Sequence, residues 1–305
     1  MSEEFTEYRN CRLCPRKCGI DRTEKAGICR AGAVPAVNLY MVHRGEEPPV
    51  SGSRGSGAVF FEGCPLHCIF CQNSIISKGP TSMGIPCDTG RLVEIFYELR
   101  DLGVHNINLV TALHFAPHIA SAISKAREQG FDLPFVINCS GYESAETVKM
   151  LDGLADIWLP DFKYWDSKLA AQLCHAPDYR EVTVSAIDEM FRQVGKADID
   201  PSTGLMRKGM IVRHLMLPSK LFDTKKILDH LTQRYGNDIY ISLMNQYTPM
   251  PHIKNAPPDL PFLLRKVPKG HYEAACDYLA DKGQYNAFVQ EEDASGDILI
   301  PKFRS

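Results

Sequence analysis

The sequence lacks the features that mark several large classes of protein. None of its apolar runs approaches the roughly 20 residues that a helix needs to span a bilayer. The N-terminal stretch MSEEFTEYRN is acidic and polar, so it does not predict a secretory signal peptide. We therefore expect a cytoplasmic protein without membrane spans. The absence of a fixed-period repeat and of low-complexity segments also argues against a solenoid.

The sequence also lacks a strong charge of either sign. Its 34 Lys and Arg residues nearly balance 37 Asp and Glu residues, which leaves a net charge of −3 and a pI near 6.4. It contains no run of Lys or Arg. We therefore expect no general affinity for nucleic acid or for anionic membranes. The 305 residues, 44% of them hydrophobic, provide ample material for a buried core.

Cysteine, in contrast, is abundant. The chain has eleven cysteines, an odd number, and seven of them fall in two clusters within its first quarter. In a cytoplasmic protein this pattern argues against a disulfide framework and favours thiolate ligands or reactive thiols.

Six short apolar runs predict buried parallel strands because each is rich in β-branched or aromatic residues and ends near Gly, Pro or Asn. The runs are AVFF from Ala58, INLV from Ile107, FVIN from Phe135, IWLP from Ile157, MIVRHLML from Met210 and IYISLM from Ile239. Helical patterns lie between them, for example over 89–100, 117–128 and 223–235. Alternating strands and helices predict an α/β fold with a parallel sheet. A partial (β/α)6 TIM-like barrel fits the roughly 250 available residues better than a complete barrel.

Two domains are expected along the chain. Residues 1–50 form an N-terminal cysteine-rich module with its connector, and residues 51–305 form the partial barrel. The stretch 43–57, HRGEEPPVSGSRGSG, is rich in Pro, Gly and Ser and predicts a connector.

The most informative stretch is GCPLHCIFCQN, which begins at Gly63. It follows the first predicted strand, and active sites of parallel α/β folds form at the carboxyl ends of strands. Soft thiolates at Cys64, Cys68 and Cys71 would select zinc, copper(I) or an iron–sulfur cluster. Three ligands leave a metal position open, as catalytic sites require. The alternative is a zinc knuckle completed by His67 or by a distant residue.

This CxxxCxxC spacing in a strand-to-helix loop resembles the signature of the radical S-adenosylmethionine (SAM) enzymes. SGSRGSGAVFFEGCPLHCIFCQN, INLVTALH, LPDFKYW and IVRHLMLP together resemble the pyruvate formate-lyase activating enzyme-like branch, in its group with an N-terminal CxxCPRxCG segment. The resemblance covers nearly the whole chain. It implies a 4Fe–4S cluster on Cys64, Cys68 and Cys71. It also implies reductive cleavage of SAM to a 5′-deoxyadenosyl radical that abstracts hydrogen.

The resemblance also implies a set of SAM-binding residues. They are Phe70, Thr111, Asn138, Asp161, Lys163, Arg213 and His214. Each has an ordinary alternative: a surface ion pair for Asp161 and Lys163, a turn residue for Asn138, and a core histidine for His214. The segment VTALH, which contains Thr111, departs from the family because it lacks the usual GGE-like sequence. The contacts of the SAM amino group are therefore open.

The N-terminal cluster has four cysteines: Cys11, Cys14, Cys18 and Cys29. Four thiolates would close a zinc site or complete an auxiliary iron–sulfur cluster, and spacing alone does not separate the two. We favour zinc or a structural role, because a metal could fold this glycine-rich segment. Free thiols are the alternative. The scattered cysteines at 87, 139, 174 and 276 are expected to pack as small hydrophobic residues.

Three functions follow in order of preference. By resemblance, the protein would activate a glycyl radical enzyme, using a low-potential electron donor of flavodoxin or ferredoxin type. A second hypothesis keeps the radical SAM chemistry but directs it at a small molecule or another peptide. The third is a non-catalytic, zinc-stabilised binding protein.

Overall fold

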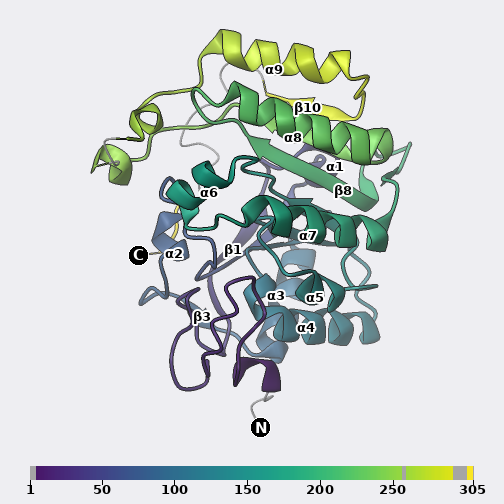
Figure 1. Ribbon diagram of the computed structural model, residues 1–305. Coiled ribbons are helices and arrows are strands. Elements are labelled where there is room, and N and C mark those ends of the chain that lie inside the picture. The colour runs from purple at the N-terminus through teal and green to yellow at the C-terminus, as the bar shows by residue number, and fades with distance from the viewer. Residues whose placement is uncertain (1–4, 256–258, 291–300, 305) are drawn as a thin grey trace.

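The computed structural model describes residues 5–255, 259–290 and 301–304 and has a mixed α/β fold built on one mostly parallel sheet (Figure 1). Seven strands run parallel to one another, and each pairs with the next one along the chain. They are β2 (Ser56–Phe61), β4 (Ile107–Val110), β5 (Phe135–Cys139), β6 (Ile157–Pro160), β8 (Met206–Leu215), β9 (Tyr240–Met244) and β10 (Ala287–Val289). The first six are the predicted strands in the predicted order, and β10 adds one that the sequence reading did not expect.

Three short antiparallel pairings extend the sheet. Strand β1 (Ala36–His43) pairs with β2 and with β3 (Ile85–Pro86), and β7 (Asp198–Ile199) pairs with β8. The sheet order therefore runs from β3 at one end to β10 at the other without closing among the described residues.

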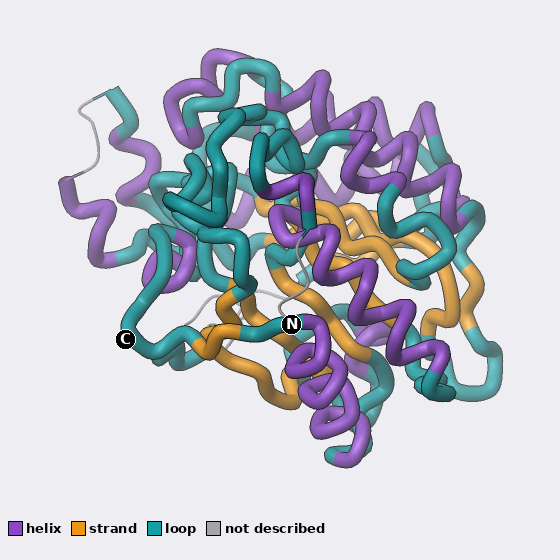
Figure 2. Tube along the Cα trace, turned by 90° about the horizontal axis from the view of Figure 1, so that it is seen from below, coloured by secondary structure: helices purple, strands orange, loops and turns teal. Residues whose placement is uncertain are grey.

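The helices that follow β2 along the chain connect successive parallel strands and lie outside the sheet (Figure 2), whereas the short α1 precedes β2. The helices are α1 (Pro48–Ser51), α2 (Ser74–Ser77), α3 (Thr89–Asp101), α4 (Ala116–Glu128), α5 (Ala145–Lys149), α6 (Ser167–Cys174), α7 (Tyr179–Val194), α8 (Leu221–Arg234) and α9 (Lys269–Asp281). Short 3-10 turns occur at Thr6–Tyr8, Leu113–Phe115, Gly236–Asp238, Pro251–Asn255 and Pro261–Leu264. No helix in the described part of the chain is long and apolar enough to cross a membrane.

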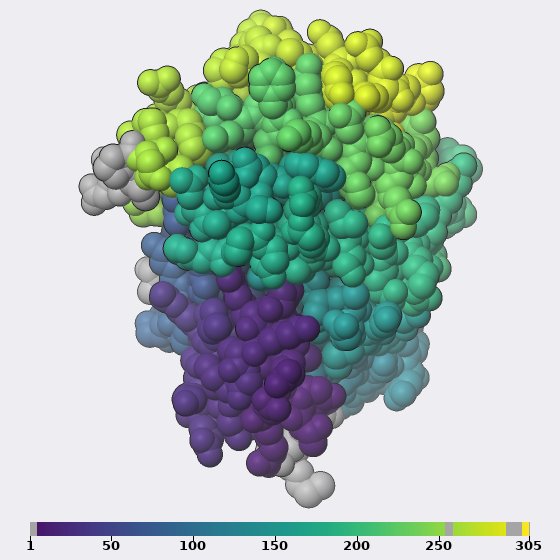
Figure 3. Space-filling model, viewed as in Figure 1, coloured from purple at the N-terminus to yellow at the C-terminus, as the bar shows by residue number. Residues whose placement is uncertain are grey.

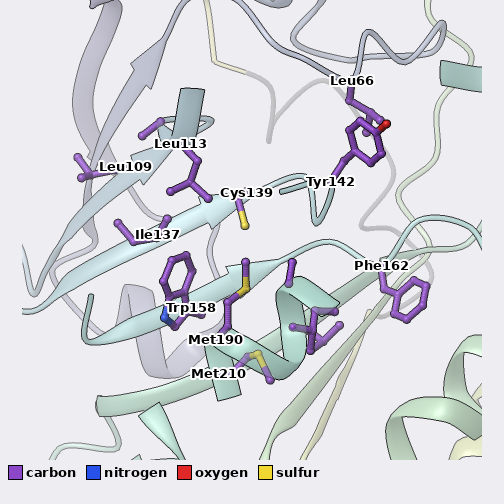
Figure 4. Packing of buried hydrophobic residues seen from close by; sticks show 14 of the residues in the cluster. Leu66, Leu109, Leu113, Ile137, Cys139, Tyr142, Trp158, Phe162, Met190 and Met210 are labelled. Atoms are coloured by element: carbon purple, nitrogen blue, oxygen red, sulfur yellow. The ribbon is translucent and has the colours of Figure 1, made fainter. Parts of the chain in front are cut away.

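The helix-facing side of the sheet forms the main core. Successive side chains of a strand point to opposite faces, so alternate residues of each strand reach the helices. Leu109, Ile137, Trp158 and Met210 occupy this face on four neighbouring strands and pack in one cluster that also contains Met190 of α7 (Figure 4). The core thereby holds the carboxyl ends of these strands at one edge of the sheet.

The other face of the sheet encloses a smaller interior. Val136, Ile157, Leu159 and Ile211 line it and pack around Val50 of α1, which is completely buried. The stretch predicted as a connector is thus not simply a link between two domains, because α1 fills the inside of the curved sheet. Its Pro48 and Val50 supply the local reason: a proline suits a first helical turn, and the apolar side chain seeks burial.

Candidate active site

A pocket of about 440 Å³ opens at the carboxyl ends of the parallel strands. Phe60 from β2 and Phe288 from β10 both line it, so the sheet curves until its first and last parallel strands face one cavity. Nine of the ten residues predicted for the cluster and for SAM line this same pocket. They are Cys64, Cys68, Phe70, Cys71, Thr111, Asn138, Asp161, Lys163 and Arg213. The fold therefore gathers residues that lie up to 149 positions apart, from 64 to 213.

The three cysteines of the triplet lie in the loop between β2 and α2. The backbone N–H of Leu66 approaches the sulfur of Cys64 at 3.4 Å, and the Tyr164 hydroxyl approaches the sulfur of Cys68 at 3.7 Å. Burial, with the two neighbouring thiols, raises the pKa of Cys64 to about 12. Burial also raises the pKa of Cys71. Three thiolates in this setting therefore need a cationic partner.

Three soft thiolates are a donor set that zinc, copper(I) or an iron–sulfur cluster accepts. No group of three or more His, Cys, Asp and Glu side chains within the described ranges is arranged to hold a metal ion. His67, the alternative zinc ligand, points its Nε2 to the carbonyl of Ile28 at 2.7 Å. The His67 ring thus has a backbone hydrogen-bond partner in the N-terminal segment.

Asp161 and Lys163 follow β6 and form an ion pair with 2.5 Å between Oδ2 and Nζ. Burial opposes the charge on Lys163, but Asp161 and the sulfurs of Cys68 and Cys71 raise its pKa overall. The ammonium therefore stays protonated beside the cysteine loop. It is available for a carboxylate bound between the loop and β6.

Tyr179 bridges the segments that follow β5 and β6 by hydrogen bonds, a role that the sequence did not indicate. Its hydroxyl accepts from the Lys163 N–H at 2.9 Å and donates to the Ser140 or Asp161 carbonyl, at 2.8 and 3.0 Å. Gly141 permits the close approach: a Cβ there would lie 2.0 Å from the Asp161 carbonyl oxygen, at a φ of +78°. A buried tyrosine on a distant helix carries no local signal of this role.

Thr111 and Asn138 end neighbouring strands and are joined by the backbone. The Thr111 N–H donates to the Asn138 carbonyl at 2.8 Å, and Thr111 has a φ of +58°. That left-handed conformation is unusual for a β-branched residue and costs on the order of 1–2 kcal/mol. Phe70 lines the same pocket, with its ring 5.8 Å from that of Tyr247 and 6.5 Å from that of Tyr164. The pocket thus offers both polar strand ends and an aromatic ring, which suits a ligand with polar groups and an apolar ring.

Arg213 occupies the inner end of the pocket with two partners that the sequence reading did not include. Its guanidinium binds Glu47 through Nε at 2.8 Å and Nη2 at 2.5 Å, and Nη2 also contacts Glu46. Asn108 donates to the Glu46 carboxylate at 2.7 Å. All three charged side chains are almost fully buried. Both glutamates belong to the 43–57 stretch, where nothing in the local sequence indicates a fixed position.

His214 differs from the expectation. It lies on the opposite face of β8 from Arg213 and is not among the residues lining the pocket. Its Nδ1 lies 2.7 Å from the Phe162 carbonyl and its Nε2 lies 2.9 Å from the Thr224 hydroxyl on α8. Strand alternation is the physical reason, because adjacent residues cannot both face the pocket.

The four N-terminal cysteines lie together outside this pocket. A Cβ placed on Gly27 would lie 3.5 Å from the Cys29 sulfur and 3.6 Å from the Cys18 sulfur. Burial, with a smaller contribution from the thiols of Cys29 and Cys11, raises the pKa of Cys14 to about 12. Of the scattered cysteines, those at 87, 139 and 174 are buried in the core as expected, and the one at 276 is half-buried. None of these four N-terminal cysteines is among the residues that line the pocket.

No family model matches the chain. An uncharacterised protein of Methanocaldococcus jannaschii is 28% identical over 258 residues, which cover 82% of this chain and 69% of the relative. Among solved structures, a domain of pyruvate-formate lyase-activating enzyme from Bacteroides vulgatus aligns with a TM-score of 0.40 and 14% identity, covering 58% of this chain and 93% of that one. Methylornithine synthase aligns with a TM-score of 0.43 and 14% identity, covering 78% and 69%. The chemistry of the site therefore rests on its own residues.

Proposed function

We propose that this protein is a radical SAM enzyme. The observation that carries the proposal is the convergence of nine predicted residues, from five separate segments of the sequence, on one pocket. A 4Fe–4S cluster on Cys64, Cys68 and Cys71 would supply the electron that cleaves SAM to methionine and a 5′-deoxyadenosyl radical. No simpler role explains why thiols, an ion pair and polar strand ends meet at one cavity.

The residues of the chain would bind and orient SAM. Lys163 offers an ammonium for the carboxylate of SAM, and Asp161 offers a carboxylate for its amino group. Thr111 and Asn138 present polar groups at the ends of β4 and β5 for the amino acid and ribose parts. Phe70 provides an apolar surface for adenine, since an aromatic ring stacks or packs edge-on against another ring.

The hydrogen donor is proposed to be a glycine of a glycyl radical enzyme, on the strength of the family resemblance. The pocket has a side that would receive a peptide backbone: Gln246 and Gln290 line it and hydrogen-bond each other at 2.7 Å. A cytoplasmic flavodoxin- or ferredoxin-type protein is the proposed electron donor. The N-terminal cysteines are proposed to bind zinc or an auxiliary cluster, supported by the position of the Cys18 and Cys29 sulfurs beside Gly27.

The test compares the wild type with a variant in which Cys64, Cys68 and Cys71 are all alanine. Both are reconstituted without oxygen, and iron, sulfide and zinc are counted. Formation of 5′-deoxyadenosine from SAM is then measured with dithionite as reductant. We expect cluster and product in the wild type and neither at this site in the variant. Cys276→Ala, on helix α9, is the matched control that should keep both. Wild-type protein that binds only zinc and no SAM would refute the proposal.

A further inference from the structure

The N-terminal module, here residues 5–35, packs directly against the cysteine loop, residues 63–73. Figure 3 shows the start of the chain as one compact purple region set against later segments. The backbone N–H of Cys64 donates to the carbonyl of Cys29 at 3.1 Å. The His67 ring and the Ile28 carbonyl form a second contact at 2.7 Å. Cys29 of the N-terminal group and Cys64 of the cysteine loop are therefore in direct backbone contact.

Gly63 shows how close this contact is. Its φ is +84°, and a Cβ at this position would lie 2.7 Å from the Cys29 carbonyl oxygen. Real Cβ atoms do not approach so closely, so the contact requires glycine at this turn. The module and the loop thus fit each other at the level of the backbone.

Arg16 joins the module to two further segments. Its guanidinium donates to the Pro65 carbonyl at 3.0 Å, the His175 carbonyl at 2.5 Å and the Cys174 carbonyl at 2.7 Å. The last two carbonyls belong to the carboxyl end of α6, where helix carbonyls lack partners within the helix and a cation is favoured. Because Pro65 lies inside the cysteine loop, Arg16 connects that loop to a fixed helix.

The module has little apolar material of its own. Its hydrophobic cluster is small, with Tyr8, Cys11 and Leu13 as the buried members. The buried Arg22 organises much of the rest, with bonds to the carbonyls of Ala31 and Gly32. A segment with so small a core depends strongly on polar bonds or on a metal for its shape.

We propose that the N-terminal module is the structural support of the cysteine loop, with Arg16 as its main positioning residue. In this role the four N-terminal cysteines act on the pocket indirectly, because disrupting them loosens the module and then the loop. The inference relies on the proposed function only in naming residues 63–73 as the ligating loop. It does not require SAM cleavage.

Hydrogen exchange on the full-length protein, kept reduced and free of oxygen, tests this role. We compare the wild type, Arg16→Ala and Arg12→Ala, an exposed arginine of the same module. Loss of the hydrogen bonds of a charged donor should increase local opening about tenfold or more. We expect faster deuterium uptake over residues 63–73 in Arg16→Ala only, with unchanged uptake in α9. Cys18→Ala should also accelerate exchange over residues 63–73. Equal uptake in the two arginine variants would overturn the proposal.

A second variant covers the case in which Arg16→Ala unfolds the whole chain, which faster uptake in α9 would reveal. Arg16→Lys keeps the positive charge but cannot reach three carbonyls at once. We expect its uptake over residues 63–73 to lie above that of the wild type, with α9 unchanged. Uptake identical to the wild type would refute the role of the three-way contact. Neither result depends on SAM, so a failure here is distinct from a failure of the proposed function.

Discussion

The buried ion cluster at the inner end of the pocket yields the sharpest prediction. Arg213→Met removes the only cation that contacts the carboxylates of Glu46 and Glu47 in the described part of the chain, and it keeps an unbranched side chain of similar reach. The two carboxylates would then remain buried without their charge partner. The change leaves the cysteine loop untouched.

The expected loss of stability follows from burial. Removing one partner of a buried ion pair costs about 3–5 kcal/mol, because the remaining charge stays out of water. Arg207, on the same strand, provides a matched control. Its side chain is 56% exposed and pairs with Asp200, whereas that of Arg213 is 12% exposed. Exposed pairs contribute about 0–1 kcal/mol, so Arg207→Met should change the free energy of unfolding little.

The loss should also depend on pH. Burial acts to raise the pKa of Glu47, but Arg213 outweighs it, so the folded pKa lies below the ordinary value of 4.5. Such a group contributes stability above that value and loses it as pH falls through the folded pKa. Without Arg213 only the hydrogen bonds from Ser242 and from the backbone still oppose the effect of burial, so the pKa of Glu47 rises and the variant loses stability as pH rises. The two proteins should therefore differ little in acid and most near neutral pH.

Urea unfolding of the reduced, metal-free proteins, followed by circular dichroism between mildly acidic and neutral pH, would measure both effects. We expect Arg213→Met to unfold at a clearly lower urea concentration at neutral pH, with the gap narrowing in acid. A loss at neutral pH no larger than that of Arg207→Met would refute the reasoning. So would a loss that stays the same at every pH.

Three further predictions concern the strand ends around β5 and β6. Gly141→Ala should unfold far more readily than Gly153→Ala in the same urea assay. The two glycines have similar φ values, 78° at Gly141 and 76° at Gly153. Only at Gly141 would an added Cβ meet the backbone, because it would lie 2.0 Å from the Asp161 carbonyl oxygen. Tyr179→Phe should cost about 1–3 kcal/mol of stability because buried backbone groups lose their partner, whereas Tyr285→Phe, at an 87% exposed tyrosine, should cost nothing measurable. Lys163→Met should weaken SAM binding, measured by equilibrium dialysis, by about tenfold or more. Lys168→Met, at an exposed lysine, should leave the affinity unchanged. Equal affinities of the two variants would show that Lys163 does not bind the SAM carboxylate.

Much of the scaffold could be predicted from local patterns. The six apolar runs are strands because β-branched and aromatic residues suit a sheet buried on both faces. Helix α3 begins where expected, since Asp88 accepts a hydrogen bond from the Arg91 N–H at its first turn. Strand β10 was missed because a run as short as Ala287–Val289 carries little periodic signal.

The residues of the candidate site also differ in how far the sequence alone predicts their positions. The spacing of Cys64, Cys68 and Cys71 places the three thiols in one loop, which lines the pocket, because spacing along the chain is a local property; that they ligate a metal stays a prediction. The roles of Arg213 and His214 were not separable by sequence alone. Which of two adjacent strand residues faces the pocket depends on how the strand is registered in the sheet.

The sequence by itself thus determined the strands and their order, since these depend on neighbouring residues. Only the tertiary structure decided that Glu46 and Glu47 lie buried against Arg213, and that Arg16 connects the N-terminal module to the cysteine loop. These contacts join residues 49 to 167 positions apart. Such pairings arise from the curvature of the sheet and the packing of whole segments, which no short stretch of sequence encodes.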